Sequence, residues 1–294
     1  MFRHACAFAE VADMAEEKFK KYPEYKAALV KKAASAGVKI NLDNPKTIQD
    51  KINWLKLFDS TPLKTKCADK VLVHEYCKEK LGEDICIPII KTYDKAEDIK
   101  WDELPNQFVI KCNHGSGMNI IVKDKKKLDR GAARGKLAKW LKHDFSFDNG
   151  YEMHYHNIKR KILVEKFMSD GHADLVDFKI FCFNGEPKMC LVIGNRNSKS
   201  GAYRNYYDMD FNFMNLSKTR HKNNPKIRDK KPEHFEEMKE YAKKLSEDFK
   251  FVRVDFYEID GKVYLGELTF TPAAGLFNYT DKKKEIEIGN LLKL

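Results

Sequence analysis

Two carboxylates and an arginine stand at positions typical of one strand face in FVRVDFYEIDGKVYLGELT, residues 251–269. Successive side chains of a strand point to opposite faces, so Arg253 and Asp255 share one face of the first strand. Glu267 and Thr269 likewise share one face of the second strand. If these faces coincide, they suit Mg²⁺ on nucleotide phosphates, because Mg²⁺ typically takes one or two carboxylates plus phosphate oxygens. The alternative is a solvent-facing hairpin whose arginine–glutamate pair is worth less than about 1 kcal/mol.

The turn between the two strands decides whether the faces coincide. A two-residue turn, Asp260-Gly261, would put Glu267 on the face opposite Asp255. A three-residue turn that includes Ile259 would bring the charges together. Such a turn needs its last residue in the left-handed region, which Gly261 supplies. The sequence leaves both registers open.

FVIKCNHGSGMN, residues 108–119, is a second candidate, for phosphate binding. It is not a P-loop, because Lys111 precedes the glycines, no GK[ST] follows and the next segment reads as a strand. Gly115 and Gly117 also fail the GxGxxG pattern, since Ile120 follows where a third glycine is required. One interpretation is a glycine hairpin whose backbone N–H groups close over phosphate oxygens, with Lys111 aimed at them. The other is a surface hairpin that needs glycine for positive φ.

Two further patterns give weaker signals. VEKFM, residues 164–168, suits an adenine-binding hinge whose backbone groups contact the base edge, or an ordinary core strand with exposed Glu165 and Lys166. His154 and His156 have strand spacing but no clear third ligand, which is weak evidence for a metal site.

The stretch 195–231 is basic, and tyrosines are interleaved with its cations. Tyr203, Tyr206 and Tyr207 suggest a nucleic-acid groove, where aromatic side chains stack on bases. The alternative is a solvated basic face. The cations are Lys199, Arg204, Lys218, Arg220, Lys222, Lys226, Arg228, Lys230 and Lys231.

The elements that must position these residues follow from periodicity. Residues 1–87 read mainly as helix, with Pro45 where a helix can begin and Gly82 as a C-cap. Later helices are expected over 127–145 and 232–249. Asn184-Gly185 marks a hairpin turn, and 195–231 reads as a long loop with at most one strand. Strand patterns lie at 85–94, 105–113, 119–124, 161–168, 175–185, 186–195 and 251–272. The chain is therefore expected to be α+β with antiparallel pairs, and no βαβαβ alternation supports a Rossmann fold.

Length and composition bound the class of protein. The 294 residues are 43% hydrophobic and 34% charged, which indicates a folded globular chain rather than a disordered one. The net charge of +11 favours a polyanionic partner without choosing among nucleic acid, membrane surface, nucleotide and acidic glycan.

The cellular compartment is predicted from cysteines and hydropathy. Seven cysteines without CxxC pairing indicate free thiols in a reducing cytoplasm rather than a disulfide framework or zinc site. The N-terminus lacks a basic leader followed by an apolar segment, so no signal peptide is expected, and no apolar stretch reaches the ~18–20 residues of a membrane helix. The expected location is the bacterial cytoplasm, and the oligomeric state is left open.

The order of these parts resembles the ATP-grasp superfamily. The phrases LPNQFVIKCNHGSGMNIIV, FKIFCFNGEPK, FVRVDFY and GELTFTP are similar to those of the branch typified by the teichuronopeptide-biosynthesis (TupA-like) proteins. The similarity runs from about residue 45 to 277. It implies an α+β ATP-grasp fold in which the nucleotide lies between a small lid and a larger antiparallel-sheet domain. The implied parts are a helical lead-in (1–87), a lid subdomain (88–164) and a large subdomain with the Mg²⁺-binding hairpin (165–294).

The resemblance also implies roles for matching residues. Lys70 and Lys111 would contact the ATP phosphates, and Arg253 would act beside the reacting phosphate with Lys111 as the other catalytic residue. The implied phosphate loop is Gly115, Ser116 and Gly117; the adenine hinge contains Glu165 and Phe167; the Mg²⁺ ligands are Asp255, Glu267 and Thr269.

One departure concerns the second Mg²⁺ position, where many ATP-grasp ligases have Glu-x-Asn and this chain has Glu267-Leu268-Thr269. A threonine hydroxyl is a weaker ligand than an amide oxygen. The expectation is a more loosely held second ion, or one held by Glu267 alone.

The implied activity is an ATP-dependent carboxylate–amine ligase that forms an amide through an acyl phosphate. For this branch the implied acceptor is a uronic-acid carboxylate of a capsular or cell-surface polysaccharide or its precursor, and an amine or amino acid is the other partner. Asp177, Lys179 and Arg204 are the candidates for the acceptor pocket. The alternatives are a kinase acting on a sugar or small molecule and, from another class, a non-catalytic basic nucleic-acid binder; no nucleic acid is expected on the ligase interpretation.

Overall fold

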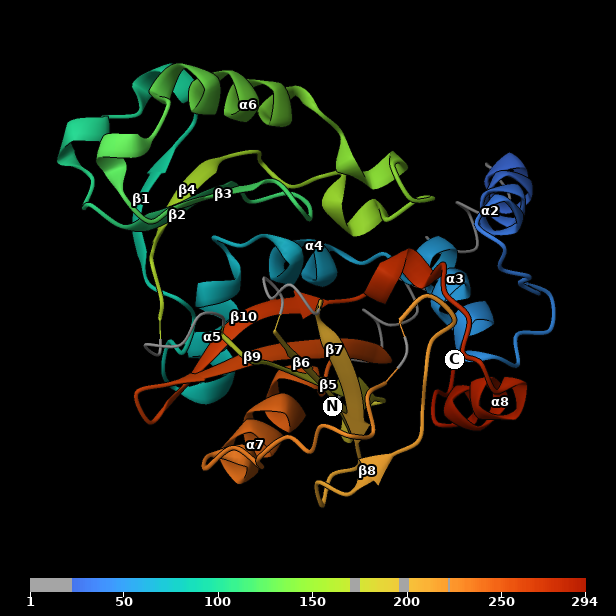
Figure 1. Ribbon diagram of the computed structural model, residues 1–294. Helices are drawn as coiled ribbons and strands as arrows, with labels where there is room; N and C mark the ends of the chain where they lie inside the picture. The colour runs from blue at the N-terminus through green and yellow to red at the C-terminus, as the bar shows by residue number, and fades with distance from the viewer. Residues whose placement is uncertain (1–22, 170–174, 196–200, 222) are drawn as a thin grey trace.

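Two antiparallel sheets lie one above the other in the computed structural model, which describes residues 23–169, 175–195, 201–221 and 223–294 (Figure 1). The smaller sheet has the order β1-β4-β2-β3, formed by β1 (Ile89–Tyr93), β2 (Phe108–Cys112), β3 (Asn119–Val122) and β4 (Ile162–Lys166). The larger has the order β10-β9-β5-β6-β7-β8, formed by β5 (Asp177–Phe183), β6 (Glu186–Gly194), β7 (Tyr203–Tyr207), β8 (Phe213–Met214), β9 (Phe251–Ile259) and β10 (Lys262–Thr269). The α+β class expected from the sequence is confirmed.

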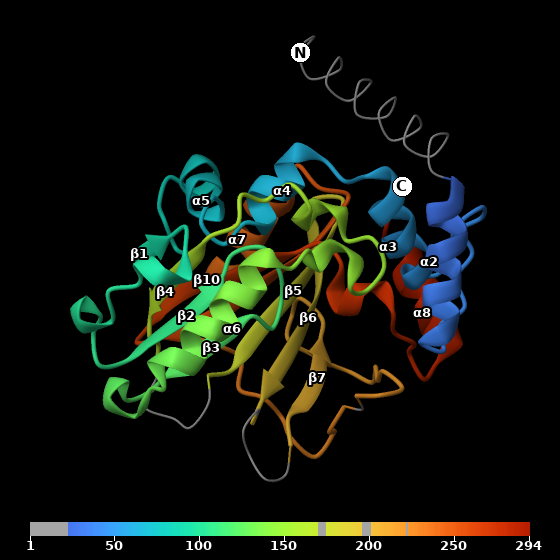
Figure 2. The same cartoon turned by 90° about the horizontal axis from the view of Figure 1, so that it is seen from above.

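The smaller sheet, here called the lid sheet, buries one face against α6 (Arg130–Lys142). Period-2 alternation puts Phe108 and Ile110 of β2 on this face, where they share a core with Ala133 and Leu137 of α6. The alternate side chains of β2, Val109 and Lys111, therefore point to the other face. In Figures 1 and 2, α6 covers the side of the lid sheet away from the larger sheet, so this second face looks toward the larger sheet.

The larger sheet is covered on its far side by α7 (Phe235–Ser246), which lies beneath β5 and β9 in Figure 1. Phe235, Met238, Ala242 and Leu245 are fully buried, as their helical spacing predicts. They pack into the same core as the alternate residues of β5 and β9 that point down. The remaining side chains of these two strands lie on the opposite face, where Phe181, Phe183 and Phe251 pack in a second core with Ile48 and Ile288.

The N-terminal helices are α2 (Pro23–Ser35), α3 (Ile48–Phe58), α4 (Pro62–Ala68) and α5 (Val73–Leu81). Helix α3 begins after a capping box of Thr47 and Asp50, so the expected start at Pro45 was wrong by three residues. Gly82 is the left-handed C-cap of α5, with φ 79°, as predicted. In Figure 2, α2, α3 and the C-terminal helix α8 (Lys282–Asn290) gather at the end of the molecule away from β1.

In the part of the chain that the structure describes, the connections include six short 3₁₀ turns, and they test two of the expectations from the sequence. Asn184 and Gly185 form the two-residue turn between β5 and β6, both with positive φ, as predicted. The stretch 195–231 carries two strands, β7 and β8, where at most one was expected. The 3₁₀ turns are η1 (Ala96–Asp98), η2 (Trp101–Glu103), η3 (Lys125–Lys127), η4 (Phe145–Phe147), η5 (Met153–Tyr155) and η6 (Pro272–Gly275). Within the described ranges, every helix is too short or too polar to cross a membrane.

Candidate active site

A cavity of about 670 Å³ lies between the lid sheet and the larger sheet. This volume is in the range of small-molecule sites, about 300–1,000 Å³. The sequence-predicted residues that line it are Lys70, Lys111, Gly115, Ser116, Gly117, Glu165, Phe167, Asp177, Lys179, Arg253, Asp255 and Glu267. Residues from five separate parts of the chain thus meet in one place.

The β9–β10 hairpin brings the two carboxylates together by a route that neither expected register describes. Its turn is the two-residue one, because Lys262 pairs with Ile259. The register then shifts at Gly266, so that Glu267 pairs with Asp255. Such a β-bulge adds one residue to one strand and moves the following side chains to the opposite face. The bulge, and not the turn, therefore places Asp255 and Glu267 directly across from each other.

Glycine is required at the bulge for steric reasons. A Cβ atom on Gly266 would lie 2.7 Å from Cε2 of Tyr257 on the neighbouring strand. The sequence contains a signal for the bulge that was missed: Val263 and Leu265 are buried with period 2, but the next buried residue is Leu268, three positions on. This slip in the alternation marks the extra residue.

Asp255 lies in a buried network of charges on β5 and β9. Arg253 donates through Nε to Oδ1 at 2.6 Å and through Nη2 to Oδ2 at 2.7 Å. Lys179 also donates to Asp255, and its Nζ lies 3.1 Å from Oδ1 of Asp177. Burial alone would raise the pKa of Asp255, but the charges of Arg253 and Lys179 outweigh it and hold this pKa below its usual value of 3.8. The carboxylate is therefore ionised at neutral pH.

This network predicts a pH-dependent loss of stability. Replacing Asp255 by Asn leaves two buried cations without their counter-charge, and we expect about 3 kcal/mol less free energy of unfolding at pH 7. The pKa of Asp255 is lower in the folded than in the unfolded state. The extra free energy of unfolding of the wild type over Asp255→Asn is therefore complete above the unfolded-state pKa of Asp255. It disappears as the pH falls through the folded-state pKa. The difference should be undiminished at pH 5 and shrink below about pH 4, as measured by urea unfolding. Asp260→Asn, in the exposed turn, is the matched control; an Asp255→Asn variant as stable as the control at pH 7 would contradict the network.

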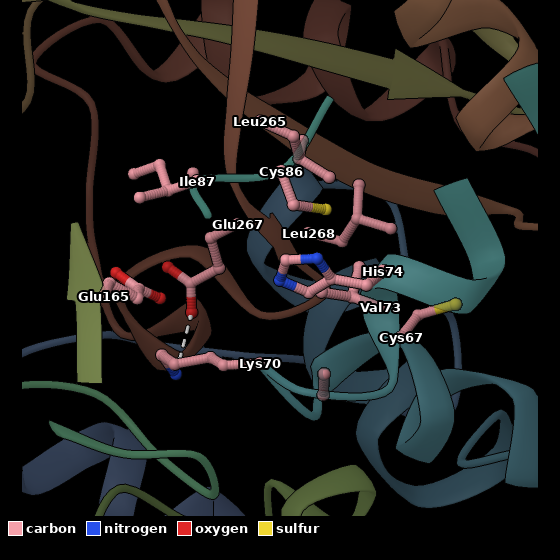
Figure 3. A pocket seen from close by; sticks show the side chains of 12 residues that line it. Cys67, Lys70, Val73, His74, Cys86, Ile87, Glu165, Leu265, Glu267 and Leu268 are labelled. Atoms are coloured by element: carbon pink, nitrogen blue, oxygen red, sulfur yellow. Dashed lines mark ion pairs between the residues drawn. The ribbon is translucent and has the colours of Figure 1, made fainter. Parts of the chain in front are cut away.

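Two lysines reach the cavity, Lys111 from the lid sheet and Lys70 from the turn between α4 and α5. Nζ of Lys111 lies 2.6 Å from Oε2 of Glu165 on the adjacent strand. Lys70, between α4 and α5, donates to the backbone oxygen of Gly115 at 2.6 Å and lies 3.8 Å from Oε1 of Glu267. Figure 3 shows Lys70, Glu165 and Glu267 meeting at this edge of the cavity. Burial lowers the pKa of Lys70, Lys111 lowers it further, and Glu267 opposes both, so an anionic ligand would stabilise its charged form.

The glycine loop after β2 is packed against the rest of the lid. A Cβ on Gly115 would lie 2.6 Å from Cγ of Phe145, and Gly117 has φ 75°, so glycine is needed at both positions. The loop is tied to the Lys70 turn by Asn113, whose side chain donates to Oδ1 of Asp69 at 2.9 Å. Sequence reasoning missed this pair, although Asp69 is next to Lys70 and Asn113 is two residues from Lys111, both of which it selected.

An apolar wall completes the cavity and was also missed. It is formed by Ile87, Val109, Ile121 and Met168 together with Phe167. Ile121 is 57% exposed, an unusual fraction for a large aliphatic side chain on a strand. The available signal was the alternation in β2, which puts Val109 on the same face as Lys111.

Two predicted site residues lie outside the cavity lining. The hydroxyl of Thr269 accepts a hydrogen bond from Nη2 of Arg253 at 3.1 Å. Arg204 is on β7, where it pairs with Ile193, further along the same sheet. The expected metal-ligand role of Thr269 and acceptor role of Arg204 stay predictions.

Both carboxylates of the hairpin fit a Mg²⁺ ion by type, and Glu267 is also accessible to one. Glu267 is 28% exposed, and its 3.8 Å separation from Lys70 is longer than a hydrogen bond. Asp255 is already shared between Arg253 and Lys179, so it would divide its oxygens between these cations and an ion. Oxygen donors of this kind are those that Mg²⁺ prefers.

The tyrosines and histidines that suggested other kinds of site have structural roles instead. Tyr206 and Tyr207 are buried, so they cannot stack on bases, and Tyr203 donates to Asp229 at 2.6 Å. His154 is buried, with its pKa lowered to about 3 by burial and then by Lys64 and Lys56, whereas His156 pairs with Asp144 at 2.7 Å. Of the basic stretch, Lys199 and Lys222 lie outside the described residues.

The cysteines that the structure describes are free thiols, as expected, and Cys6 lies outside the described part. Behind the Lys70 edge, Sγ of Cys86 lies 3.4 Å from Sγ of Cys77 (Figure 3 shows Cys86). Beside it, Nδ1 of His74 lies 2.9 Å from Oδ2 of Asp84. His74, Asp84 and Cys86 are the one group of metal-ligating side chains that cluster within 4.8 Å among the described residues.

Comparison with known proteins gives one family and several solved structures. The family described as TupA-like ATPgrasp matches residues 50–293. No curated protein matches the chain. D-alanine–D-alanine ligase from Bacillus anthracis complexed with ATP is 16% identical, with a TM-score of 0.41, over 76% of this chain and 61% of that one. The same ligase from Helicobacter pylori is 20% identical, with a TM-score of 0.41, over 77% of this chain and 58% of that one. ATP-grasp ligase PsnB complexed with minimal precursor, Mg and ADP is 10% identical, with a TM-score of 0.40, over 72% of this chain and 52% of that one. The chain therefore spans little more than half the length of these proteins.

Proposed function

Because this chain belongs to the TupA-like ATP-grasp family, we propose that it is an ATP-dependent carboxylate–amine ligase. The observation that supports this most directly is the composition of the cavity between the two sheets. Lys111 from the lid sheet and Lys70 from the turn between α4 and α5 line the same cavity as a pair of carboxylates on the larger sheet, and an apolar wall adjoins them. Lysines and Mg²⁺-binding carboxylates suit a triphosphate, and an apolar wall suits a purine base.

The nucleotide would lie along the lid sheet. Lys111 and Lys70 would contact the phosphates, with the backbone of the loop Gly115–Gly117 closing over them. Val109 and Ile121 would cover the base, and the backbone around Glu165 and Phe167 would contact its edge. Glu165 would also keep Lys111 extended into the cavity, since the two side chains are 2.6 Å apart.

Asp255 and Glu267 would hold Mg²⁺, because they are cross-strand partners directly after the bulge and both line the cavity. When bound, Mg²⁺ neutralises charge on the phosphates and orients them. With Thr269 engaged by Arg253, Glu267 is the residue of the Glu-x-Thr segment that remains to bind the ion.

The proposed reaction has two steps. An oxygen of the substrate carboxylate attacks the γ-phosphorus, the bond to the bridging oxygen breaks, and ADP leaves with the electron pair. The amine nitrogen then attacks the carbonyl carbon of the acyl phosphate, loses a proton, and displaces inorganic phosphate to give the amide. Arg253 is held by Asp255 beside the phosphates, where its charge stabilises the transferring group. The lid excludes water, which would otherwise hydrolyse the acyl phosphate.

The acceptor would be a uronic acid of a cell-surface polysaccharide or its precursor. Support comes from the net charge of +11 and from the basic stretch, since both favour an acidic ligand. Phosphoryl transfer to a sugar, without an amine, is the competing reaction at the same site.

The test is ADP release measured with Mg²⁺ against a panel of uronic acids crossed with amines. The ligase proposal requires turnover that depends on both a carboxylate and an amine, and a thermal shift on adding MgATP. Turnover with no amine requirement would favour the kinase. Absence of any ATP consumption together with absence of a MgATP thermal shift would refute both.

A further inference from the structure

Behind the Lys70 edge of the cavity, three side chains of types that bind transition metals come together from two short segments. His74 lies in the first turn of α5, and Asp84 and Cys86 follow the C-cap of that helix. Nδ1 of His74 lies 2.9 Å from Oδ2 of Asp84. One ring nitrogen, one carboxylate oxygen and Sγ of Cys86 all lie within 4.8 Å of one another. Imidazole, carboxylate and thiolate are the side-chain groups that bind Zn²⁺.

The spacing of these three atoms is close to that around a tetrahedral ion. Zn–N bonds of about 2.0 Å and Zn–S bonds of about 2.3 Å put neighbouring ligand atoms about 3.3–3.8 Å apart. The distance between His74 and Asp84 is shorter than this range, and the upper limit of 4.8 Å is longer. The side chains therefore reach one ion after shifts of about 1 Å. Asp84, whose side chain is 26% exposed, has room for such a shift and leaves a path from solvent.

A second thiol adjoins the cluster. Cys77 follows His74 by three positions on α5, so their side chains share one face of that helix. Its Sγ lies 3.4 Å from Sγ of Cys86. A metal-bound thiol is deprotonated, so the S–H of Cys77 would donate to the Cys86 thiolate, and outer partners of this kind hold metal ligands in place. The spacing is H-x-x-C followed by D-x-C, which the search for CxxC pairs did not cover.

A cavity of about 10 Å³ lies beside the cluster and is lined by both His74 and Cys86. This is about the volume that one water molecule requires. A water in this place would be the fourth ligand, as at zinc sites with three protein ligands. Figure 3 shows His74 and Cys86 on one side of the cavity and Glu165 and Glu267 on the other.

We propose that His74, Asp84 and Cys86 form a Zn²⁺ site that is distinct from the Mg²⁺ position on the β9–β10 hairpin. A nitrogen, an oxygen and a sulfur donor favour Zn²⁺ over Mg²⁺, which prefers oxygen ligands. On binding, the Cys86 thiol becomes a thiolate and its proton goes to solvent. Lys78, whose Nζ lies 3.6 Å from Oδ2 of Asp84, is 63% exposed and turns to solvent when the ion takes its place. The site goes beyond the proposed ligase function and does not depend on it.

The ion would join α5 to the hairpin. Cys86 forms a parallel bridge with Leu265, and the N–H of Leu265 donates to the oxygen of Ile85 at 2.8 Å. Leu265 directly precedes the bulge at Gly266. Zn²⁺ would therefore stabilise the strand position that sets the facing of Glu267, and adding it should raise the Tm of the chain.

The test is Zn²⁺ and Co²⁺ binding by the full chain, which is freed of metal with a chelator and kept reduced with a phosphine. Wild type is expected to bind one Zn²⁺ per chain. Co²⁺ in its place should give the near-ultraviolet charge-transfer band of a cobalt–thiolate bond. Carboxylates do not give this band, so it separates the site from the Mg²⁺ position. Cys86→Ser should lose the band and at least 100-fold in Zn²⁺ affinity.

Two milder variants guard against misfolding of Cys86→Ser. Asp84→Asn keeps an oxygen for the hydrogen bond from the Cys86 N–H, at 3.1 Å, and His74→Gln replaces a partly exposed side chain. Each should weaken Zn²⁺ binding at least tenfold. The matched control is His143→Gln, because His143 also contacts an aspartate, Asp148, at 2.8 Å but belongs to no such cluster among the described residues. It should bind Zn²⁺ within twofold of wild type.

Two cysteine variants control for other thiols. Cys182→Ser changes another buried thiol, and Cys6→Ser changes the one near the N-terminus. Both should keep the cobalt band at wild-type intensity.

Three results would overturn the site: no Zn²⁺ bound by wild type, a band that persists in folded Cys86→Ser, or Zn²⁺ affinity in both Asp84→Asn and His74→Gln equal to that of His143→Gln. None of these readouts uses ATP. Failure of MgATP binding or of amine-dependent turnover would therefore refute the ligase proposal and leave the Zn²⁺ site standing, and the reverse holds equally.

Discussion

Glu267→Gln is expected to lower ATP turnover by about 10³-fold. The substitution keeps the shape of the side chain and removes the charge that would hold Mg²⁺ across from Asp255. Charge stabilisation by a bound metal is worth several kcal/mol in the transition state, and about 4 kcal/mol corresponds to this factor. Stability should change little, because Glu267 is partly exposed and its partner Lys70 is 3.8 Å away.

The measurement is ADP release at saturating MgATP, together with the Mg²⁺ concentration at half-maximal rate. Glu287→Gln is the matched control, since Glu287 is exposed on α8 and pairs with Lys284 at the surface. Turnover by Glu267→Gln within threefold of this control would mean that the metal site has been placed wrongly.

Lys111→Met is expected to lose both MgATP affinity and turnover, each by at least 100-fold. It removes a phosphate contact and also leaves Glu165, which is 6% exposed, without its ion-pair partner. Breaking a buried pair by removing one partner costs about 3 kcal/mol, so this variant should also be less stable. Loss of activity alone would therefore not separate a binding role from a structural one.

A double variant makes this separation. Lys111→Met with Glu165→Gln removes both charges and should recover most of the free energy of unfolding, while MgATP binding stays lost. Lys127→Met, at an exposed lid position, is the control for removing one positive charge from the lid. MgATP affinity in the double variant within threefold of the control would contradict the phosphate-contact role of Lys111.

The parts of the site that lie within one hairpin were predictable from the sequence. Alternation in β2 puts Lys111 on the face that looks into the cavity, and the glycines that follow it line the same cavity, while their contact with phosphates stays a prediction. The β9–β10 hairpin was predicted as a pair of strands, but its register was not, because a bulge depends on the close approach of Gly266 and Tyr257. The slip in buried positions after Leu265 was the one local sign of it.

Contacts between segments far apart in the sequence could not be predicted in the same way. The apolar wall combines Ile121 of β3 with Phe167 and Met168, which follow β4 more than forty residues later in the chain. Similarly, Lys218 is near Phe277 only because the segments 217–219 and 278–280 pair. Local periodicity carries no information on such pairings. The basic, tyrosine-containing stretch misled for the same reason, since Tyr206 and Tyr207 turned out to be core residues.

The bulge at Gly266 separates the tip of the β9–β10 hairpin from the cavity. The register at Asp255 and Glu267 is set where the extra residue sits, several residues after the exposed turn at Asp260 and Gly261. The tip can therefore vary in length and composition without changing which side chains reach the cavity. This makes the Asp260–Gly261 junction a suitable place to insert an epitope or a fluorescent label in a working enzyme. By contrast, a regular register that paired Gly266 with Asp255 would keep a two-stranded hairpin but reverse the facing of Glu267.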